Sequence, residues 1–256
     1  MVQPTTIAGQ VHIGLSGFAY KPWQGEGRFY PPKLKASEYL AYYGTQFDAL
    51  ELDGTWYRLP NENVVAAWSA AVPGGFRFCP KLHRKVTHLA RLLEEGDEIL
   101  QAFVDRMTPL AERHQMGAIL VQLPPNLGAK DDRLVRWLER APKRFGNGDS
   151  IRYAFEFRGS GWKSEQTLQV LDEYGAAWVA SESDEEAGEL LGRAFYYVRL
   201  RKSEYTSDEL DEWARRFVRA RELGRDCFVF CKHEDEGSPW EWARHLATAL
   251  GESRKT

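Results

Sequence analysis

Residues 51–60 read ELDGTWYRLP, and this stretch gives the clearest indication of the fold. Leu50 and Leu52 alternate with Glu51 and Asp53, so a strand here would place two aliphatic side chains on one face and two carboxylates on the other. A glycine then leads into an aromatic loop that ends at a proline. Buried carboxylates need partners, and we expect those partners at the matching ends of neighbouring strands.

The same kind of segment recurs along the whole chain. Strands are predicted over residues 12–17, 47–55, 76–82, 118–123, 153–158, 176–182, 195–201 and 226–233. Helices are predicted over residues 37–43, 62–71, 94–115, 131–140, 164–174, 184–191, 207–223 and 239–250. Eight strand–helix units with short links predict an α/β protein with a (β/α)8 TIM barrel. An open doubly wound sheet is the alternative.

The predicted barrel occupies a single domain, residues 11–250, between polar tails at residues 1–10 and 251–256. A chain of 256 residues that is 43% hydrophobic is large enough to bury a substantial core. Its formal net charge of −3 gives no general attraction to nucleic acid or to an anionic membrane.

Localisation is predicted to be cytoplasmic. The chain contains no run of about 18 apolar residues, and the N-terminal sequence MVQPTTIAGQ lacks the apolar core of a signal peptide. Cys227 and Cys231 lie four positions apart on one predicted strand, roughly 13 Å at the rise of a strand. That separation is too long for a disulfide, which favours a reducing compartment.

Alternation within the predicted strands sorts the polar side chains onto one face. In a parallel barrel the helix-facing side chains are apolar, while lumen-facing side chains can become polar near the C-terminal mouth. The polar set assigned to the lumen is Ser16, Glu51, Asp53, Lys81, Gln122, Glu156, Arg158, Arg199 and Arg201, with either Lys232 or His233. Bases outnumber acids in this set, which favours an anionic ligand. A self-neutralising ion network that only fills the barrel is the alternative.

Six motifs occur in an order that resembles a known family. They are GLSGFAY, the pattern W-x-G-x-G-x-F-Y-P over residues 23–31, ELDGTWYRLP, FRFCPK with Thr87-His88, VQLPP and EFRGSGW. Together they cover nearly the whole chain and resemble the YecE-like family, also called domain of unknown function family 72. The resemblance implies a TIM barrel, in agreement with the strand count. It implies no activity, because the family is named for lacking one.

Several positions differ from the usual pattern of that family. Asp53 stands where members tend to have Asn, Trp56 where they have Phe, and Gly159 where they have His. Arg201-Lys202 stands where members have His-Gly after the seventh strand, and residues 231–235 stand where members have the Asn-rich end of the eighth strand. The first half of the site therefore resembles the family closely, whereas the part built from the last two strands is altered.

Three residues are candidates for catalysis. Glu51 and Glu156 would stand across the barrel mouth from each other, which suits an acid and a base flanking a small substrate. Each could instead be held by an arginine, as Glu156 by Arg199. Lys81 would serve as a general base or a Schiff-base lysine if it is desolvated, or would pair with Glu51.

Loop aromatics and the remaining polar residues are candidates for substrate binding. Flat rings beside cations suit sugars or nucleobases that carry phosphate, although the rings could simply shield the barrel. The predicted binding set is Ser16, Asp53, Trp56, Tyr57, Arg58, Gln122, Arg158, Trp162, Arg199 and Lys232, with Trp56, Tyr57 and Trp162 as walls. A phosphate site after the last two strands would depend on Gly237-Ser238.

Metal and nucleotide motifs are weak in this sequence. Metal ligands could come from Glu51, Asp53, Glu156, His83, His88 and His233, but no His-x-His or His-Glu-x-x-His spacing occurs, so no metal site is predicted. The sequence contains neither a Walker loop nor a nucleophile-elbow serine. The identity of any cofactor is left open.

The sequence therefore predicts a barrel whose mouth binds a small anionic or polyhydroxylated ligand, such as a sugar phosphate or a nucleotide-like molecule. Arg158, Arg199 and Lys81 would hold the negative charge, with or without carboxylate acid/base catalysis of an isomerase, lyase or hydrolase reaction. The alternative is a non-catalytic binding protein for nucleic acid or a protein partner. That protein would use residues 83–85 (HRK) and the basic helix at residues 215–225. No membrane partner is expected, and the oligomeric state is left open.

Overall fold

The strands form one parallel sheet that curls into a barrel. The computed structural model describes residues 8–232 and 238–251, and the strand order is β3-β2-β1-β8-β7-β6-β5-β4. The strands are β1 (Val11–Ser16), β2 (Ala49–Leu52), β3 (Arg77–Pro80), β4 (Ile119–Gln122), β5 (Tyr153–Glu156), β6 (Ala177–Glu182), β7 (Tyr196–Leu200) and β8 (Cys227–Cys231). The outermost strands meet through parallel bridges from Phe78 to Met116 and from Lys81 to Leu120. The predicted TIM barrel is confirmed, and the open doubly wound sheet was the wrong alternative.

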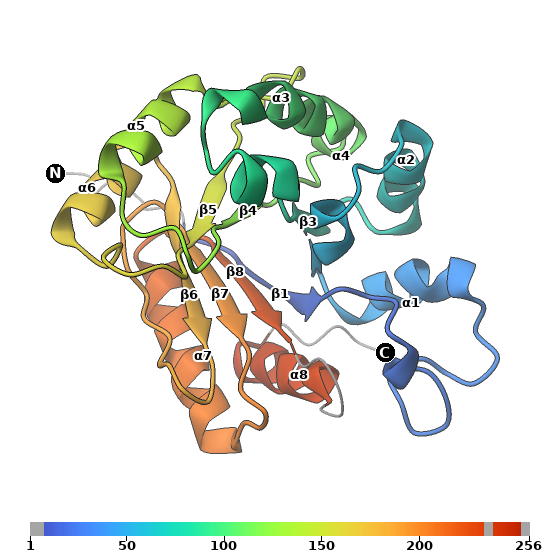
Figure 1. The fold of residues 1–256 in the computed structure, drawn as a ribbon. Coiled ribbons are helices and arrows are strands. Elements are labelled where there is room, and N and C mark those ends of the chain that lie inside the picture. The colour runs from blue at the N-terminus through green and yellow to red at the C-terminus, as the bar shows by residue number, and fades with distance from the viewer. Residues whose placement is uncertain (1–7, 233–237, 252–256) are drawn as a thin grey trace, which may run out of the picture.

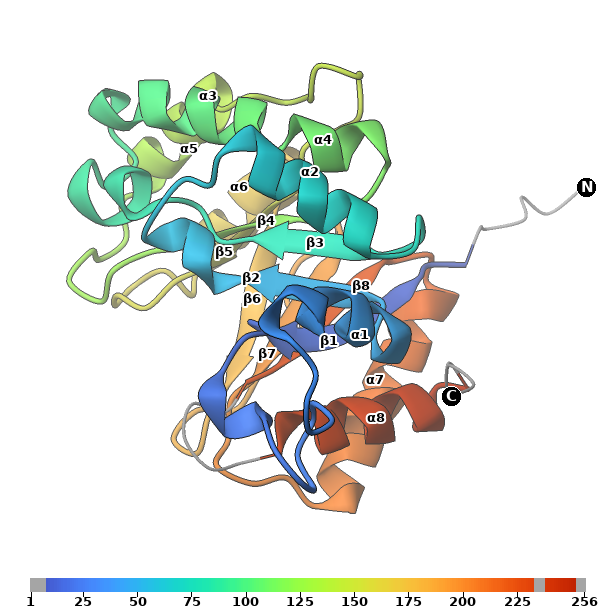
Figure 2. The same cartoon turned by 90° about the vertical axis from the view of Figure 1, so that its right-hand side faces the viewer.

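Helices surround the outside of the barrel (Figure 1), and the view at 90° shows the same arrangement (Figure 2). They are α1 (Tyr39–Gln46), α2 (Glu62–Ala71), α3 (Asp97–Arg106), α4 (Thr108–Glu112), α5 (Asp131–Arg140), α6 (Glu165–Glu173), α7 (Ser207–Glu222) and α8 (Pro239–Ala249). Side-chain caps fix several helix starts. The Ser164 hydroxyl accepts from the backbone N–H of Thr167 and caps the start of α6. Thr206 and Glu209 form a capping box at the start of α7.

The helix predicted over residues 94–115 is interrupted. A short 3-10 turn, Glu94–Gly96, precedes α3, and α4 begins separately after Met107. Pro109 lies in the first turn of α4, where its missing N–H costs nothing, but it would have broken a continuous helix.

The helix predicted over residues 184–191 is wrong, because this segment folds into bends and turns. Backbone hydrogen bonds join Ser183 and Glu186 in a tight turn. Gly188 then passes so close to α7 that a Cβ atom at this position would lie 2.8 Å from the Trp213 ring. The tight turn and this close approach to α7 leave the β6–β7 connection as a non-helical loop.

The lower part of the lumen is apolar. Its side chains come from alternate strand positions: Ala49, Cys79, Ala118, Leu120, Ala154, Ala177, Val179, Phe195, Tyr197, Phe228 and Phe230. The intervening positions belong to the larger core between strands and helices. This division confirms the alternation expected for a parallel barrel and fixes which side chains reach the lumen farther along each strand.

The ends of the chain are described only in part. Residues 1–7 and 252–256, which make up most of the predicted tails, lie outside the described residues. Within residues 8–232 and 238–251, every helix is too short or too polar to cross a membrane.

Candidate functional site at the barrel mouth

A polar layer lies directly above the apolar layer, at the C-terminal ends of the strands. Its buried members are Ser16, Glu51, Gln122, Glu156 and Arg199. Strand register brings them together in pairs, since Ser16 is the β1 partner of Glu51 and Gln122 is the β4 partner of Glu156. The predicted convergence of these residues at one end of the barrel is therefore observed.

Arg199 lies at the centre of this layer and is fully buried. Its Nη1 donates to Glu156 Oε2 at 2.6 Å, and its Nη2 donates to Glu51 Oε1 at 2.9 Å. Nη2 also lies 3.9 Å from Asp53 Oδ1. One guanidinium group thus binds both glutamates that were predicted to be catalytic. This is the arrangement expected from the alternative in which each glutamate is held by an arginine.

Neutral donors complete the coordination of the two glutamates. The Tyr197 hydroxyl donates to Glu51 Oε2 at 2.7 Å, and Ser16 Oγ lies 2.5 Å from Glu51 Oε1. Gln122 Nε2 donates to Glu156 Oε2 at 2.7 Å. Charge-assisted hydrogen bonds of this kind offset the cost of burying the carboxylates.

The electrostatics of the mouth favour the ionised forms of Glu156 and Asp53. Burial alone would raise the pKa of Glu156, but Arg199 and Arg158 outweigh it and hold the pKa well below its usual range. Burial also opposes ionisation of Asp53, whose pKa is nevertheless lowered by Arg199, Lys232 and Lys81. A glutamate held this way carries no proton at neutral pH, so Glu156 is a poor general acid.

The loop after β2 begins as a 3-10 turn, Asp53–Trp56. Thr55 anchors it by donating to the carbonyl oxygens of Leu52 and Lys81, so the loop is tied to the end of β3. The Trp56 ring makes edge contacts with Tyr57 and His88. Trp56 thus forms part of the rim as predicted, while Tyr57 is 69% exposed beside it.

Lys81 extends from the end of β3 toward this loop. Its Nζ lies 5.0 Å from the centre of the Trp56 ring, a cation–π contact. The predicted pairing with Glu51 is not seen, because Glu51 is engaged by Arg199. Burial, followed by the charge of Arg199, lowers the pKa of Lys81.

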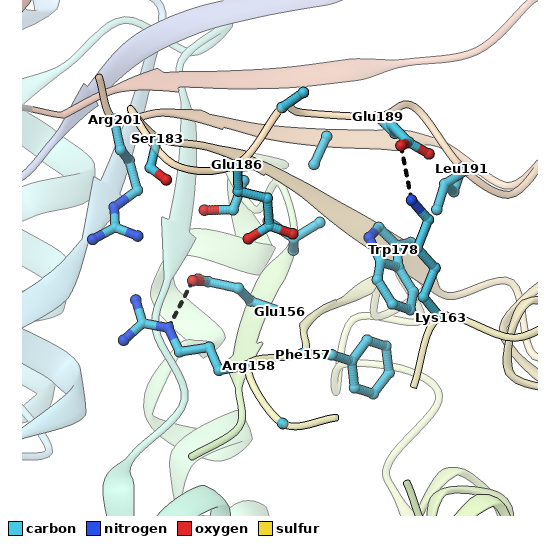
Figure 3. Close-up of a pocket in the computed structure, with 15 residues that line it drawn as sticks. Glu156, Phe157, Arg158, Lys163, Trp178, Ser183, Glu186, Glu189, Leu191 and Arg201 are labelled. Carbon is cyan, nitrogen blue, oxygen red and sulfur yellow. Dashed lines mark hydrogen bonds and ion pairs between the residues drawn. The ribbon is translucent and has the colours of Figure 1, made fainter. Parts of the chain in front are cut away.

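A pocket of about 260 Å³ opens beside the mouth, between the ends of β5 and β6 and the β6–β7 loop. Arg158 Nε donates to Glu156 Oε1 at 3.0 Å, and the Arg158 side chain is 37% exposed. Figure 3 shows the guanidinium groups of Arg158 and Arg201 extending to the same side, away from Trp178 and Lys163. Glu189, on the opposite side of the pocket, pairs with Lys163 at 2.7 Å.

Strand β8 contributes one cation to the mouth. Phe228 and Phe230 face the lumen, so alternation directs Lys232 inward as well. Its Nζ lies 3.8 Å from Asp53 Oδ2. His233, the other inward candidate, and Gly237 of the predicted phosphate loop lie outside the described residues.

Two predicted binding residues do not line the mouth as expected. Trp162 is buried, stacks on Phe157 and donates its indole N–H to Leu127 O at 2.8 Å. Its predicted role as an open wall is therefore corrected to packing in the loop after β5. Arg58 is exposed just beyond the 3-10 turn.

Two residues of the mouth were absent from the predicted binding set. Tyr197 donates to Glu51 and belongs to the lumen by strand alternation, which was the available signal. Arg201 follows two positions after Arg199 and was assigned to the lumen without a binding role.

In residues 8–232 and 238–251, no three His, Cys, Asp or Glu side chains are gathered so that they could hold a metal ion.

The basic helix proposed for nucleic acid is partly neutralised. Arg215 and Arg216 pair with Glu212, and Arg225 donates to Gly192 O and the Tyr196 hydroxyl.

Comparisons with known proteins agree with the fold. Residues 12–256 match the family model described as "Protein of unknown function DUF72". UPF0759 protein YunF of Bacillus subtilis (strain 168) is 29% identical over 184 residues, 68% of this chain and 61% of YunF. UPF0759 protein YecE of Escherichia coli (strain K12) is 31% identical over 159 residues, 62% of this chain and 53% of YecE. The matches therefore span only part of the length of these relatives.

Among solved structures, the chain resembles a DUF72 family protein, TM1631, from Thermotoga maritima MSB8. The TM-score is 0.78 at 24% identity, over 94% of this chain and 99% of that one. At this identity the likeness establishes a shared fold and leaves the chemistry of the mouth to be argued from its own residues.

Proposed function

The chain belongs to the DUF72 family of proteins of unknown function, and on this premise we propose that the barrel mouth binds a small ligand with an anionic group. A sugar phosphate or a nucleotide has the required chemistry. The observation that carries the proposal is an excess of cations at the strand ends. Five basic side chains, Lys81, Arg158, Arg199, Arg201 and Lys232, gather with three acidic ones from the strand ends, Glu51, Asp53 and Glu156, and the β6–β7 loop adds a further acid, Glu186, to the pocket of Arg158 and Arg201.

Part of this set already balances the charge of the acids of the mouth. Arg199 engages Glu51 and Glu156, and Lys232 lies near Asp53. Arg158 uses only its Nε toward Glu156. Its outer guanidinium nitrogens, together with Arg201 and Lys81, are the groups that would meet a phosphate or carboxylate.

Three buried polar atoms support a ligand at this place. Trp56 Nε1 and Arg199 Nε are donors, and Asp53 Oδ1 is an acceptor, and none has a hydrogen-bond partner among the described residues. Leaving such a group unpaired costs about 1–3 kcal/mol. A ligand that carries both anionic oxygens and hydroxyl groups would offer partners to both kinds of atom.

Glu51 and Glu156 fit a structural role in this proposal. They keep Arg199 fixed at the floor of the mouth, and their hydrogen bonds to Tyr197 and Gln122 leave little freedom for proton transfer. Acid/base work by this pair therefore receives less support than ligand binding does.

Isothermal titration calorimetry with ribose 5-phosphate tests the proposal. We expect saturable binding that weakens as ionic strength rises, because the contacts are charge pairs near solvent. Replacing both rim arginines (Arg158→Ala with Arg201→Ala) should weaken binding at least about tenfold, the effect of losing roughly 1.4 kcal/mol.

The matched control is Arg193→Ala, which removes an arginine whose side chain is 83% exposed at the far end of the β6–β7 loop. This control should bind like the unchanged protein. Equal affinity in the double variant and the control would overturn the proposal.

A further inference from the structure

In the part of the chain that the structure describes, Lys81 and Arg201 are the cations of the mouth that form no ion pair with an acid. Arg158 pairs with Glu156, and Lys232 lies near Asp53. Among the residues that the structure describes, no carboxylate reaches ion-pair distance of Lys81. The acids that act on it electrostatically are Asp53, Glu51 and Glu156, and Arg199 lies within 4 Å of each of them.

The surroundings of Lys81 favour loss of its proton. The side chain is mostly shielded from solvent and is repelled by Arg199, and these two effects lower its pKa despite the opposing charges of Asp53, Glu51 and Glu156. The contact with the Trp56 ring holds the side chain in place and by itself favours the protonated form. His88 contacts the same ring, and Arg84 lies 5.9 Å from its centre, so further basic groups surround the site. Burial next to another cation lowers the pKa of a lysine and makes its neutral amine available as a nucleophile.

Lys81 also lies where a ligand would be held. It follows β3 at the C-terminal mouth, where barrel enzymes carry their reactive groups. Its backbone is fixed on both sides, since its N–H donates to Leu52 O and its carbonyl accepts from Thr55. The amine is therefore presented from a rigid strand end. Lys81 lies outside the lining of the pocket that contains Arg158 and Arg201, so its flexible chain of four methylenes would have to carry Nζ toward a ligand held there.

We propose that Lys81 forms a Schiff base with an aldehyde or ketone whose anionic group is held by Arg158 and Arg201. This inference rests on the proposed anion-binding function and names the ligand class, a small phosphorylated or carboxylated carbonyl compound. The neutral amine adds to the carbonyl carbon and gives a carbinolamine. The C–O bond then breaks, a solvent proton accompanies the departing oxygen as water, and a protonated C=N bond remains.

Reductive trapping tests this assignment directly. The protein is incubated with glyceraldehyde 3-phosphate and sodium borohydride, which delivers hydride to the iminium carbon and fixes the ligand as a secondary amine. Intact-mass and peptide mass spectrometry should find one adduct per chain, on the peptide that contains Lys81. Lys81→Arg should abolish this adduct, because arginine keeps the charge but does not form a Schiff base.

Lys85→Arg is the matched control, since Lys85 is an exposed lysine four residues away. It should leave trapping unchanged. Unphosphorylated glyceraldehyde should label Lys81 at least about tenfold less at the same concentration, the loss expected when one charged contact is missing.

The outcomes separate the two proposals. If ribose 5-phosphate binds in calorimetry but the adducts spread over surface lysines and persist in Lys81→Arg, the Schiff-base assignment is overturned and anion binding stands. If both aldehydes label Lys81 equally and phosphate compounds do not bind, the lysine is reactive but the anion site is overturned. Absence of any adduct on Lys81 would also overturn the Schiff-base assignment and leave Lys81 with its contact to the Trp56 ring as its role.

Discussion

The lower and upper layers of the barrel lumen are built by the same strands but from opposite kinds of residue. Ala49, Ala154 and Tyr197 lie in the lower, mainly apolar layer, and the next inward positions, Glu51, Glu156 and Arg199, carry charge. Only two residues along each strand separate the layers. The lower layer is stabilised by removing apolar surface from water, whereas the upper layer depends on specific partners.

On the proposed function, this difference predicts that stability and ligand binding depend on different layers of one barrel. An aliphatic side chain of the lower layer, such as Leu120, is replaced at the cost of its packing alone. An upper-layer side chain leaves behind the charge that it was holding, so the same kind of truncation has a different consequence. Substitutions in the two layers should therefore separate effects on folding from effects on the ligand.

The largest expected effect is that of Arg199→Met. This change leaves two buried glutamates without their shared cation, and breaking a buried pair in this way costs about 3–5 kcal/mol of unfolding free energy. Urea denaturation at neutral pH measures it, with the exposed Arg193→Met as a control expected within about 0.5 kcal/mol of the unchanged protein. A loss below about 1 kcal/mol in Arg199→Met would mean that the upper layer does not depend on this guanidinium.

Leu120→Ala makes the corresponding change in the lower layer. Leu120 is fully buried, and its truncation should cost roughly 2–5 kcal/mol through lost burial and a residual cavity. Ligand affinity measured by calorimetry should remain within about twofold, a difference near 0.4 kcal/mol, because no charge in the mouth is disturbed. A large loss of affinity would show that the layers are not separable.

Tyr197→Phe removes one hydrogen bond between the layers and nothing else. The Tyr197 hydroxyl donates to buried Glu51, and a hydrogen bond to a charged group contributes about 1.5–3 kcal/mol. Thermal and urea denaturation should show this loss. Tyr57→Phe, at an exposed tyrosine of the rim, should show almost none, and an equal loss in both variants would contradict the assignment.

The smallest expected effect is a pH dependence that comes from Glu156. Because Arg199 and Arg158 lower its pKa in the folded protein, its contribution is complete above the unfolded pKa of about 4.3 and is lost as pH falls below that value. Unfolding free energy measured between about pH 3 and pH 7 should therefore fall on the acid side, by roughly 1–2 kcal/mol from this group. Glu156→Gln should flatten that slope, and an unchanged slope would contradict the ionised assignment.

Much of this arrangement could be predicted from local sequence. Alternation in YAFEFR and FYYVRLR was enough to place Glu156 and Arg199 on the lumen side, because the direction of a strand side chain is set by its own backbone. The eight-strand count and the motif order gave the same barrel. Lys232 could be assigned inward only after Phe228 and Phe230 were located.

The partners of these residues could not be predicted in the same way. Arg199 is 43 residues from Glu156 and 148 from Glu51, so their contact depends on strand register across the whole barrel. Trp162 and Trp56 both stand in aromatic loops, yet only tertiary packing decides that the Trp162 indole is buried on Leu127. The helix expected at residues 184–191 failed for a similar reason, since the close approach of Gly188 to Trp213 is a long-range contact.

On the proposed function, the acids around buried Arg199 are neutralised, while Arg158 and Arg201 at the rim of the mouth bind an anion. NMR of the arginine Nε–Hε groups tests this division most directly. The protein would carry ¹⁵N-labelled arginine and be titrated with inorganic phosphate. The rim resonances of Arg158 and Arg201 should shift together and saturate, while that of exposed Arg193 stays fixed. Uniform small shifts of all surface arginines, with no saturation at Arg158 and Arg201, would contradict an anion site at the mouth.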